Sequence, residues 1–172
     1  MKRLTVLRHA KSSWENANFA DFDRPLNERG RKAARRVGRE LKLGAFHLDL
    51  CVASTAVRVR ETLEGLIEGY SNWGVEIRFE PRIYEASLAT LVEIVHGLPE
   101  SSTAPLVIGH NPGLHRLVLE LARDDSKGLR DRLLNRFPTA AVAVLELKAD
   151  CWAKVGAAGG EIAELIFPRD LD

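Results

Sequence analysis

Two histidines and two arginines stand where they could act on a phosphate group. Arg8 and His9 directly follow the apolar run Leu4–Leu7, Arg58 lies early in a helical stretch after a second apolar run, and His110 comes shortly after a third. A neutral imidazole can attack phosphorus in line and become a covalent phosphohistidine, and an arginine fork matches the oxygens of a phosphoryl group. These residue types predict a phosphoryl-transfer site that works through a covalent intermediate without a metal.

Predicted strands must bring these residues together. The apolar runs Leu4–Leu7, Leu48–Ala53 and Leu106–Ile108 each predict a buried strand, and the segment from Asn27 to Gly44 predicts an amphipathic helix. Strands that alternate with helices imply an α/β sheet. In such sheets ligands bind beyond the carboxyl ends of the strands, so residues that follow strands converge in space.

The rest of the chain completes this pattern. Further strands are predicted at Val75–Phe79, Ala140–Leu147 and Ile162–Phe167, and further helices from Ser54, at Leu88–Val95 and at Pro112–Ala122. Ser54 is a candidate N-cap, and Pro112 at a first-turn position would aim backbone N–H groups toward an anion. A glycine-containing turn joins the last two strands in a hairpin-like arrangement. The charged stretch Asp124–Arg132 is interpreted as a mobile linker.

Size and composition favour an ordinary globular protein. The chain has 172 residues, 45% hydrophobic and 28% charged, with a net charge of +1, and we expect one domain over residues 1–172. Basic residues cluster between Arg29 and Arg39; on a helix such a cluster is more often a solvated face than a nucleic-acid stripe, so no nucleic-acid partner is expected.

Cysteine content and hydropathy bear on the expected compartment. Cys51 and Cys151 are too few and too far apart for a disulfide framework, which favours a reducing cytoplasm. We find no signal-like apolar region and no run of bilayer-spanning length, so no membrane association is expected. Arg58 follows Cys51 by seven residues rather than the six of the cysteine-phosphatase loop. No carboxylate or cysteine pattern at metal-ligand spacing is present, and we expect neither metal nor cofactor.

These motifs resemble the histidine phosphatase superfamily, the phosphoglycerate-mutase-like group, and within it the small SixA-type phosphohistidine phosphatases. The resemblance spans nearly the whole chain. Its markers are Leu7-Arg8-His9-Ala10-Lys11-Ser12, the stretch Asp23 to Arg31, Ser54 with Arg58, Glu61 and Thr62, Val107 to Gly113, and Phe137-Pro138-Thr139. It implies a three-layer α/β/α sandwich whose sheet is mostly parallel with an added late antiparallel strand.

The resemblance also implies roles for individual residues. His9 would be the phosphorylated nucleophile, Arg8 and Arg58 would clamp the phosphoryl oxygens, and His110 would donate a further hydrogen bond to them. Ala10 stands where the wider superfamily usually has glycine, so we expect a slightly altered backbone there.

The proton donor is assigned less directly. Larger family members carry it on an inserted segment for which this chain has no room, and Glu85 is the best candidate. The alternative is that Glu85 is a solvated carboxylate between a strand and a helix. A phosphohistidine substrate expels imidazole, which needs acid assistance far less than the strongly basic alkoxide of an alkyl phosphate.

The predicted function is therefore removal of phosphate through a His9 phosphoenzyme. The preferred substrate is phosphohistidine on a signalling or phosphotransfer protein. Two alternatives stay open: a small-molecule phosphomonoesterase that uses Glu85 as acid, and a phosphate or phosphoprotein binding module without turnover. The sequence leaves the oligomeric state open.

Overall fold

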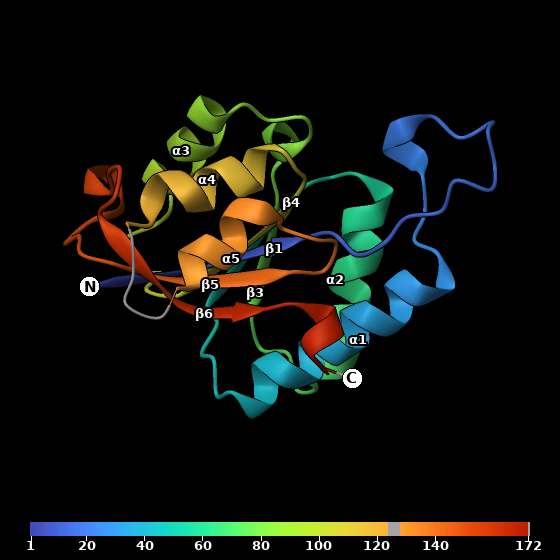
Figure 1. The fold of residues 1–172 in the computed structure, drawn as a ribbon, viewed down its shortest axis with the longest axis horizontal. Coiled ribbons are helices and arrows are strands. Elements are labelled where there is room, and N and C mark those ends of the chain that lie inside the picture. The colour runs from blue at the N-terminus through green and yellow to red at the C-terminus, as the bar shows by residue number, and fades with distance from the viewer. Residues whose placement is uncertain (124–127, 172) are drawn as a thin grey trace.

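The computed structural model describes residues 1–123 and 128–171 and contains a six-stranded mixed sheet (Figure 1). The strands are β1 (Lys2–Arg8), β2 (Leu50–Ala53), β3 (Glu76–Phe79), β4 (Pro105–Gly109), β5 (Val142–Leu147) and β6 (Gly160–Ile166), in the order β3-β2-β4-β1-β5-β6. The β1–β4, β4–β2 and β2–β3 pairs are parallel, whereas β5 runs antiparallel to both β1 and β6. The prediction of a mostly parallel sheet with a late antiparallel strand is confirmed.

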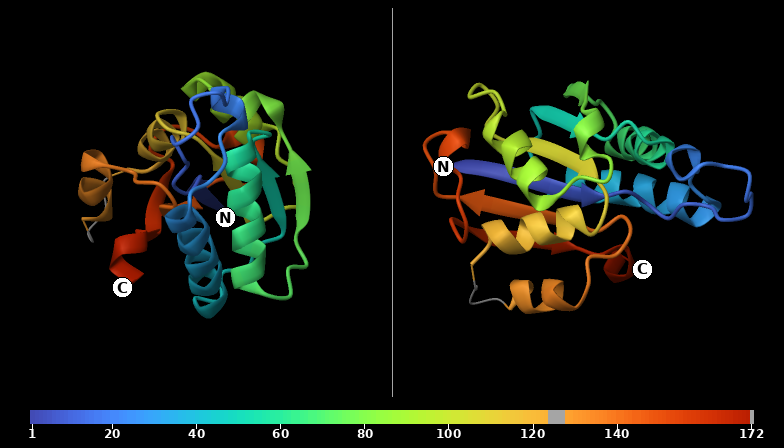
Figure 2. Two further views of the ribbon diagram at one scale, coloured as in Figure 1. Left: turned by 90° about the vertical axis from the view of Figure 1, so that its right-hand side faces the viewer. Right: turned by 90° about the horizontal axis from the view of Figure 1, so that it is seen from above.

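Helices cover both faces of the sheet and give three layers (Figure 2). One layer contains α1 (Glu28–Leu43) and α2 (Val57–Tyr70), and the other contains α3 (Leu88–His96), α4 (Gly113–Leu121) and α5 (Leu129–Asn135). Short 3-10 turns lie at Asp21–Asp23, Pro81–Ile83, Trp152–Lys154 and Pro168–Leu171.

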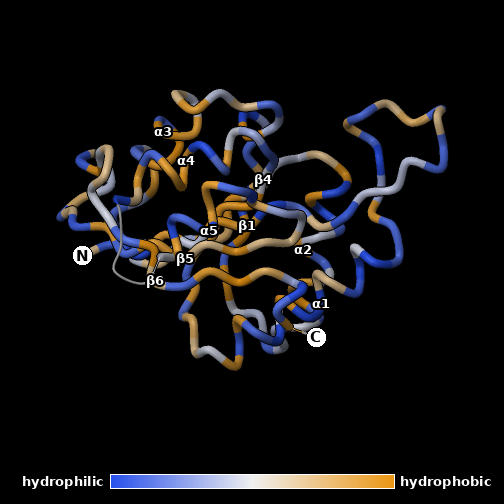
Figure 3. The backbone as a smooth tube through the Cα atoms, in the orientation of Figure 1, coloured by the Kyte–Doolittle hydropathy of each residue, from blue (hydrophilic) through white to orange (hydrophobic). Residues whose placement is uncertain are grey.

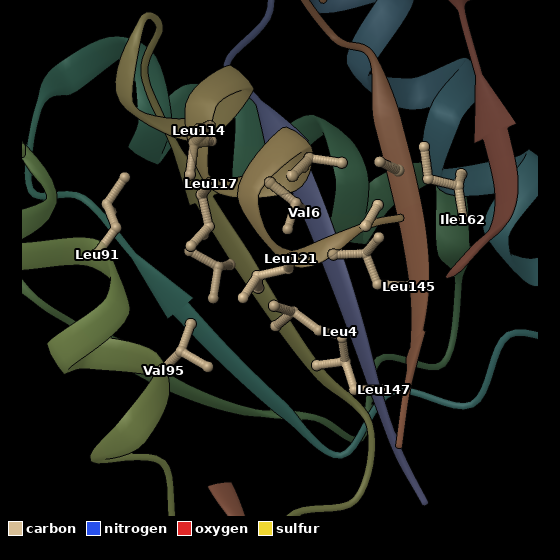
Figure 4. Close-up of a cluster of buried hydrophobic side chains, with 14 of the residues drawn as sticks. Leu4, Val6, Leu91, Val95, Leu114, Leu117, Leu121, Leu145, Leu147 and Ile162 are labelled. Carbon is tan, nitrogen blue, oxygen red and sulfur yellow. The ribbon is translucent and has the colours of Figure 1, made fainter. Parts of the chain in front are cut away.

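The central strands of the sheet are apolar on both faces because helices cover both faces there. In β1, Leu4 and Val6 belong to the cluster that includes α3 and α4 (Figure 4), whereas Leu7 belongs to the cluster that includes α1 and α2. Figure 3 shows the hydrophobic residues concentrated along the central strands. Full burial of one such side chain contributes about 1.5–3 kcal/mol to the stability of the fold. The packed core therefore fixes the positions of the strand ends.

Helix α1 begins at a side-chain cap and lies very close to the chain that follows β1. The side chain of Asn27 accepts a hydrogen bond from the backbone N–H of Gly30 at 2.8 Å. A Cβ at Gly30 would lie 2.2 Å from the carbonyl oxygen of Lys11, so this helix turn tolerates only glycine. The contact fixes the loop after His9 against α1.

Three local predictions were wrong or incomplete. Ser54 does not cap α2, because that helix begins at Val57, preceded by Ala56 without a side-chain cap. Pro112 precedes α4 rather than occupying its first turn. The predicted linker from Asp124 to Arg132 contains the start of α5, since buried Leu133 anchors residues 129–135 as a helix; residues 124–127 lie outside the described residues.

A search of the described residues for a helix long and apolar enough to cross a membrane finds none.

Candidate active site

Three neighbouring strands end at one edge of the sheet and carry the predicted site residues there. Arg8 pairs with Gly109 in register, and Ala53 pairs with Ile108, so the residues that follow β1, β2 and β4 lie side by side. The rings of His9 and His110, which are far apart in the chain, have centroids 5.3 Å apart. The predicted convergence of Arg8, His9, Arg58 and His110 is therefore present.

The His9 ring is oriented by its own backbone neighbour. Its Nδ1 lies 2.7 Å from the carbonyl oxygen of Ala10, and since a carbonyl can only accept, Nδ1 carries the proton. In the neutral ring the lone pair is then on Nε2. Burial, aided by the charges of Arg58, Arg8 and Arg24, lowers the pKa of His9 from 6.5 to about 4, so the ring is neutral at pH 7.

His110 is also buried and also neutral at pH 7. Burial, and next the charge of Arg58, lower its pKa to about 3. Its Nε2 lies 2.8 Å from the Ser54 hydroxyl oxygen, which at 3.3 Å also accepts the N–H of Ala56. Its Nδ1 is buried without a hydrogen-bond partner among the described residues. Ser54 thus holds the ring from one side and leaves the other nitrogen for a ligand.

The two arginines are held by backbone carbonyls and leave donors unused. Arg8 donates to the carbonyl of Phe137 at 2.9 Å, and Arg58 donates to the carbonyl of Asp21 at 2.6 Å. The Nε atoms of both arginines are buried without a partner among the described residues. Burial and the neighbouring charge of Arg58 lower the pKa of Arg8, which reflects two cations in one pocket.

Thr62 connects the loop that contains His9 and Ala10 to helix α2, which carries Arg58. Its hydroxyl donates to the carbonyl of Arg58 at 2.6 Å and accepts the N–H of Ala10 at 2.9 Å. Ala10 is fully buried, so this position has space for a methyl group and little more.

The structure adds three residues that sequence reasoning did not place in the site: Asp21, Tyr84 and Arg24. The Asp21 carboxylate accepts from Tyr84 at 2.7 Å, from Arg58 at 3.1 Å and from Arg24 at 3.0 Å. The hydrogen bond from Tyr84, followed by those of the two arginines, lowers the pKa of Asp21 to about 2. The sequence signals were the polar loop that contains Asp21, the Asp23-Arg24-Pro25 stretch among the family markers, and the position of Tyr84 next to Glu85. None of them assigned a role to these three residues.

Glu85 lies at the rim of a cavity beside the histidines. The cavity has a volume of about 550 Å³ and is lined by Asp21, Arg58, Glu85, Ala86, Ser87, His110, Asn111, Pro112 and Gly113. Glu85 is exposed and has a φ of 53°, a left-handed backbone conformation that is uncommon for a residue with a side chain. The structure thus brings Glu85 to the same cavity as His110 and Arg58.

The arrangement suits an anion better than a cation. Among residues 1–123 and 128–171, no three His, Cys, Asp or Glu side chains are placed to hold a metal ion together. Arg58 and His110 instead line one cavity, and the guanidinium of Arg8 and the neutral ring of His9 lie close to them. Such a pocket can bind a tetrahedral oxyanion and present a nitrogen lone pair to it.

Comparisons with known proteins agree with this geometry. The model of the histidine phosphatase superfamily, branch 1, matches residues 4–96. The Mycobacterium tuberculosis protein Rv1276c is 32% identical to the chain over 165 residues, covering 95% of this chain and 100% of that protein.

Solved structures extend the likeness to the whole fold. A candidate phosphohistidine phosphatase SixA from Nakamurella multipartitia is 30% identical, with a TM-score of 0.83, covering 97% of this chain and 96% of that one. Another candidate SixA, from Agrobacterium tumefaciens, is 26% identical, with a TM-score of 0.79, covering 97% and 98%.

Fold and site together define an α/β protein of the phosphoglycerate-mutase-like class, with two histidines and two arginines close together at the carboxyl ends of its central strands. The chain belongs to the histidine phosphatase superfamily and is one of its hydrolases. Its structure is of the SixA type.

Proposed function

We propose that the protein is a phosphohistidine phosphatase that works through a phosphorylated His9. The observation that carries the proposal is the hydrogen bond from His9 Nδ1 to the Ala10 carbonyl, because it leaves a lone pair on Nε2 of a buried, neutral ring. The similarity to two candidate phosphohistidine phosphatases, at 30% and 26% identity, supports the same activity.

The first chemical step is attack of His9 Nε2 on the substrate phosphorus. A P–N bond to His9 forms as the P–N bond to the substrate imidazole breaks, and the leaving nitrogen takes up a proton from solvent. Arg8, Arg58 and the Nδ1 side of His110 stabilise the charge on the three equatorial oxygens. In the second step water attacks the phosphorus, the P–N bond to His9 breaks, and inorganic phosphate leaves. One proton of the water returns to solvent, and His9 is again neutral.

The leaving group explains why phosphohistidine is the preferred substrate class. Imidazolium has a pKa of about 6.5, so the departing ring needs little help from a strong acid. Glu85 is exposed, and a carboxylate in water gives little assistance to an alkoxide. We propose that the phosphorylated histidine belongs to a signalling or phosphotransfer protein.

A second candidate function is hydrolysis of small phosphate esters. It is favoured by the position of Glu85 in the wall of the roughly 550 Å³ cavity, which is large enough for a small leaving group. This function requires Glu85 as general acid. Glu85→Gln should then abolish ester hydrolysis and leave phosphoramidate hydrolysis within about threefold of wild type.

The deciding experiment is intact-mass spectrometry after rapid quenching of the protein mixed with phosphoramidate or a phosphohistidine peptide. Wild type should gain an acid-labile phosphate adduct, and His9→Ala should show no adduct and at least about a thousandfold slower phosphate release. Phosphate binding without adduct or release in wild type would contradict the proposal and indicate a binding module. Faster turnover of alkyl esters than of phosphoramidate would favour the second candidate.

A further inference from the structure

A second cavity lies beside the active site and is lined by cations alone among its charged residues. It has a volume of about 200 Å³, and its walls are Lys11, Arg29, Ala33, Arg136, Pro138, Thr139, Phe167, Pro168 and Arg169. We call it the basic groove. It contrasts with the cavity around His110, whose lining includes the carboxylates of Asp21 and Glu85. A chain with a net charge of +1 therefore concentrates four cations around one small hollow.

Most cations near the groove have carboxylate partners, but those facing it do not. On α1, Arg31 pairs with Glu61, Lys32 with Glu28 and Arg35 with Glu68. The side chains of Lys11, Arg29 and Arg169 make no hydrogen bond or ion pair among the described residues. The carboxylate nearest in sequence to Arg169, that of Asp170, pairs with Arg132.

The residues of the groove are adjacent, along the chain and through hydrogen bonds, to Arg8 and His9. Lys11 is two residues after His9, and the backbone N–H of Ala140, next to Thr139, hydrogen-bonds the carbonyls of Arg8 and His9 at 3.1 Å. The carbonyl of Phe137, between Arg136 and Pro138, accepts the guanidinium of Arg8. A ligand with its phosphate at His9 can therefore reach the groove with an adjoining part.

The apolar part of the groove gives it a shaped floor. The ring of Phe167 is almost fully buried, and the guanidinium of Arg136 lies 5.8 Å from its centroid. Four separate segments form the walls: the loop after β1, the first turns of α1, the segment before β5 and the segment after β6. A hollow with fixed walls and free cations at its rim suits carboxylates that protrude from a surface.

We propose that the basic groove binds an acidic surface segment of the phosphorylated protein while its phosphohistidine occupies the catalytic pocket. This inference rests on the proposed function and specifies how the protein substrate is chosen. Charge complementarity of this kind raises the rate of productive encounter and excludes basic partners. The groove then determines substrate preference without touching the reacting atoms.

The test uses two phosphohistidine peptides that differ only in their flanks, one with Asp and Glu and the other with Asn and Gln. The double variant Arg29→Glu with Arg169→Glu should lower kcat/KM for the acidic peptide by about tenfold or more. It should leave the neutral peptide and phosphoramidate within about twofold of wild type. Added salt should reduce the preference of wild type for the acidic peptide, because exposed charges are screened.

Arg39→Glu is the matched control. Arg39 is exposed on the same helix as Arg29, has no hydrogen bond or ion pair among the described residues and does not line the groove. This variant should leave the peptide preference unchanged. Helix α1 tolerates glutamate in place of Arg29, since a negative charge in the first turn is favoured by the helix dipole.

A binding experiment separates failure of the groove from failure of catalysis. Fluorescence anisotropy with the unphosphorylated acidic peptide should show binding to wild type that the double variant loses. If no peptide is dephosphorylated but this binding persists, the proposed function is wrong and the groove proposal stands. If phosphate is released at equal rates from both peptides and the double variant has the same kcat/KM as wild type for each, the groove proposal is wrong and the proposed function stands. If inorganic phosphate binding, measured by calorimetry, is lost in the double variant while acidic-peptide binding persists, the groove serves a second small anion and the proposal is overturned.

Discussion

The two ends of the central sheet differ in how most of their buried polar groups are paired, although Trp73 Nε1, just before β3, is also buried without a partner among the described residues. At the amino end, Lys2 pairs with Glu100, and the side chain of Trp152 donates to the carbonyl of Ser102 at 2.9 Å. Asp49 there accepts from the hydroxyl of Ser102 and from the backbone N–H groups of Thr103 and Ala104.

At the carboxyl end, several buried polar atoms have no hydrogen-bond partner among the described residues: Arg8 Nε, Arg58 Nε, His110 Nδ1 and Asn111 Oδ1. An unsatisfied buried polar group costs about 1–3 kcal/mol, so folding alone does not favour this arrangement. The satisfied hydrogen bonds of the amino end stabilise the fold, whereas the carboxyl end keeps the Nε donors of Arg8 and Arg58 unpaired and available to an anion.

Among the residues proposed to hold the phosphoryl oxygens, Arg58 should give the largest change when it is removed. Arg58→Ala deletes a phosphate donor and a partner of Asp21, so kcat/KM for phosphoramidate should fall about 10²- to 10³-fold. Steady-state kinetics with a thermal melt of the same sample measures this. Arg58→Lys should recover only part of the loss, because an ammonium lacks the planar fork. Equal activity of both variants and wild type would show that Arg58 at the carboxyl end does not act on the substrate.

Acid should destabilise the catalytic end through His9. Its pKa is about 4 in the folded state and about 6.5 when unfolded, so the unfolded chain binds the proton first. The stabilisation is complete above pH 6.5 and is lost as pH falls toward 4, by on the order of 3 kcal/mol.

Urea unfolding of wild type and His9→Gln from pH 7 to pH 4 measures this dependence. The variant should lose less stability than wild type across the window. Parallel curves would show that His9 is not held neutral by burial.

Removing a hydrogen-bond acceptor from the amino end of the sheet should lower the stability of the fold and leave the activity unchanged. Asp49→Ala removes the acceptor of three neighbouring residues and should lower the free energy of unfolding by about 1–2 kcal/mol, with kcat/KM unchanged within about twofold. Urea unfolding and phosphoramidate kinetics on one preparation check both. Burial opposes ionisation of Asp49, but these hydrogen bonds lower its pKa, so its contribution should fade only in strong acid. A large loss of activity would mean that the two ends are coupled.

The central sheet and the two histidines were predictable because their signals are local. Apolar runs mark β1, β2 and β4, and topology places the residue after each strand at one edge. The start of α5 was missed because its charges dominate the stretch before Leu133, whose burial becomes visible only in three dimensions. The place of Asp21 in the site was not predicted for a similar reason, since its partners Arg58 and Tyr84 lie far along the chain. Ser54 shows the remaining ambiguity: a serine after a strand can cap a helix or hold a histidine, and here it does the latter.

The hydrogen bond from His9 Nδ1 to the Ala10 carbonyl affects how the site can change by mutation and how it could be used in protein design. Its acceptor belongs to the backbone, so no single replacement of the side chain at position 10 removes the oxygen that fixes the tautomer. Mutational drift can alter this feature only by changing the path of the main chain. The Arg8–Ala10 segment therefore carries its own ring orientation with it, and it could be transplanted to the end of another parallel strand without importing a distant carboxylate.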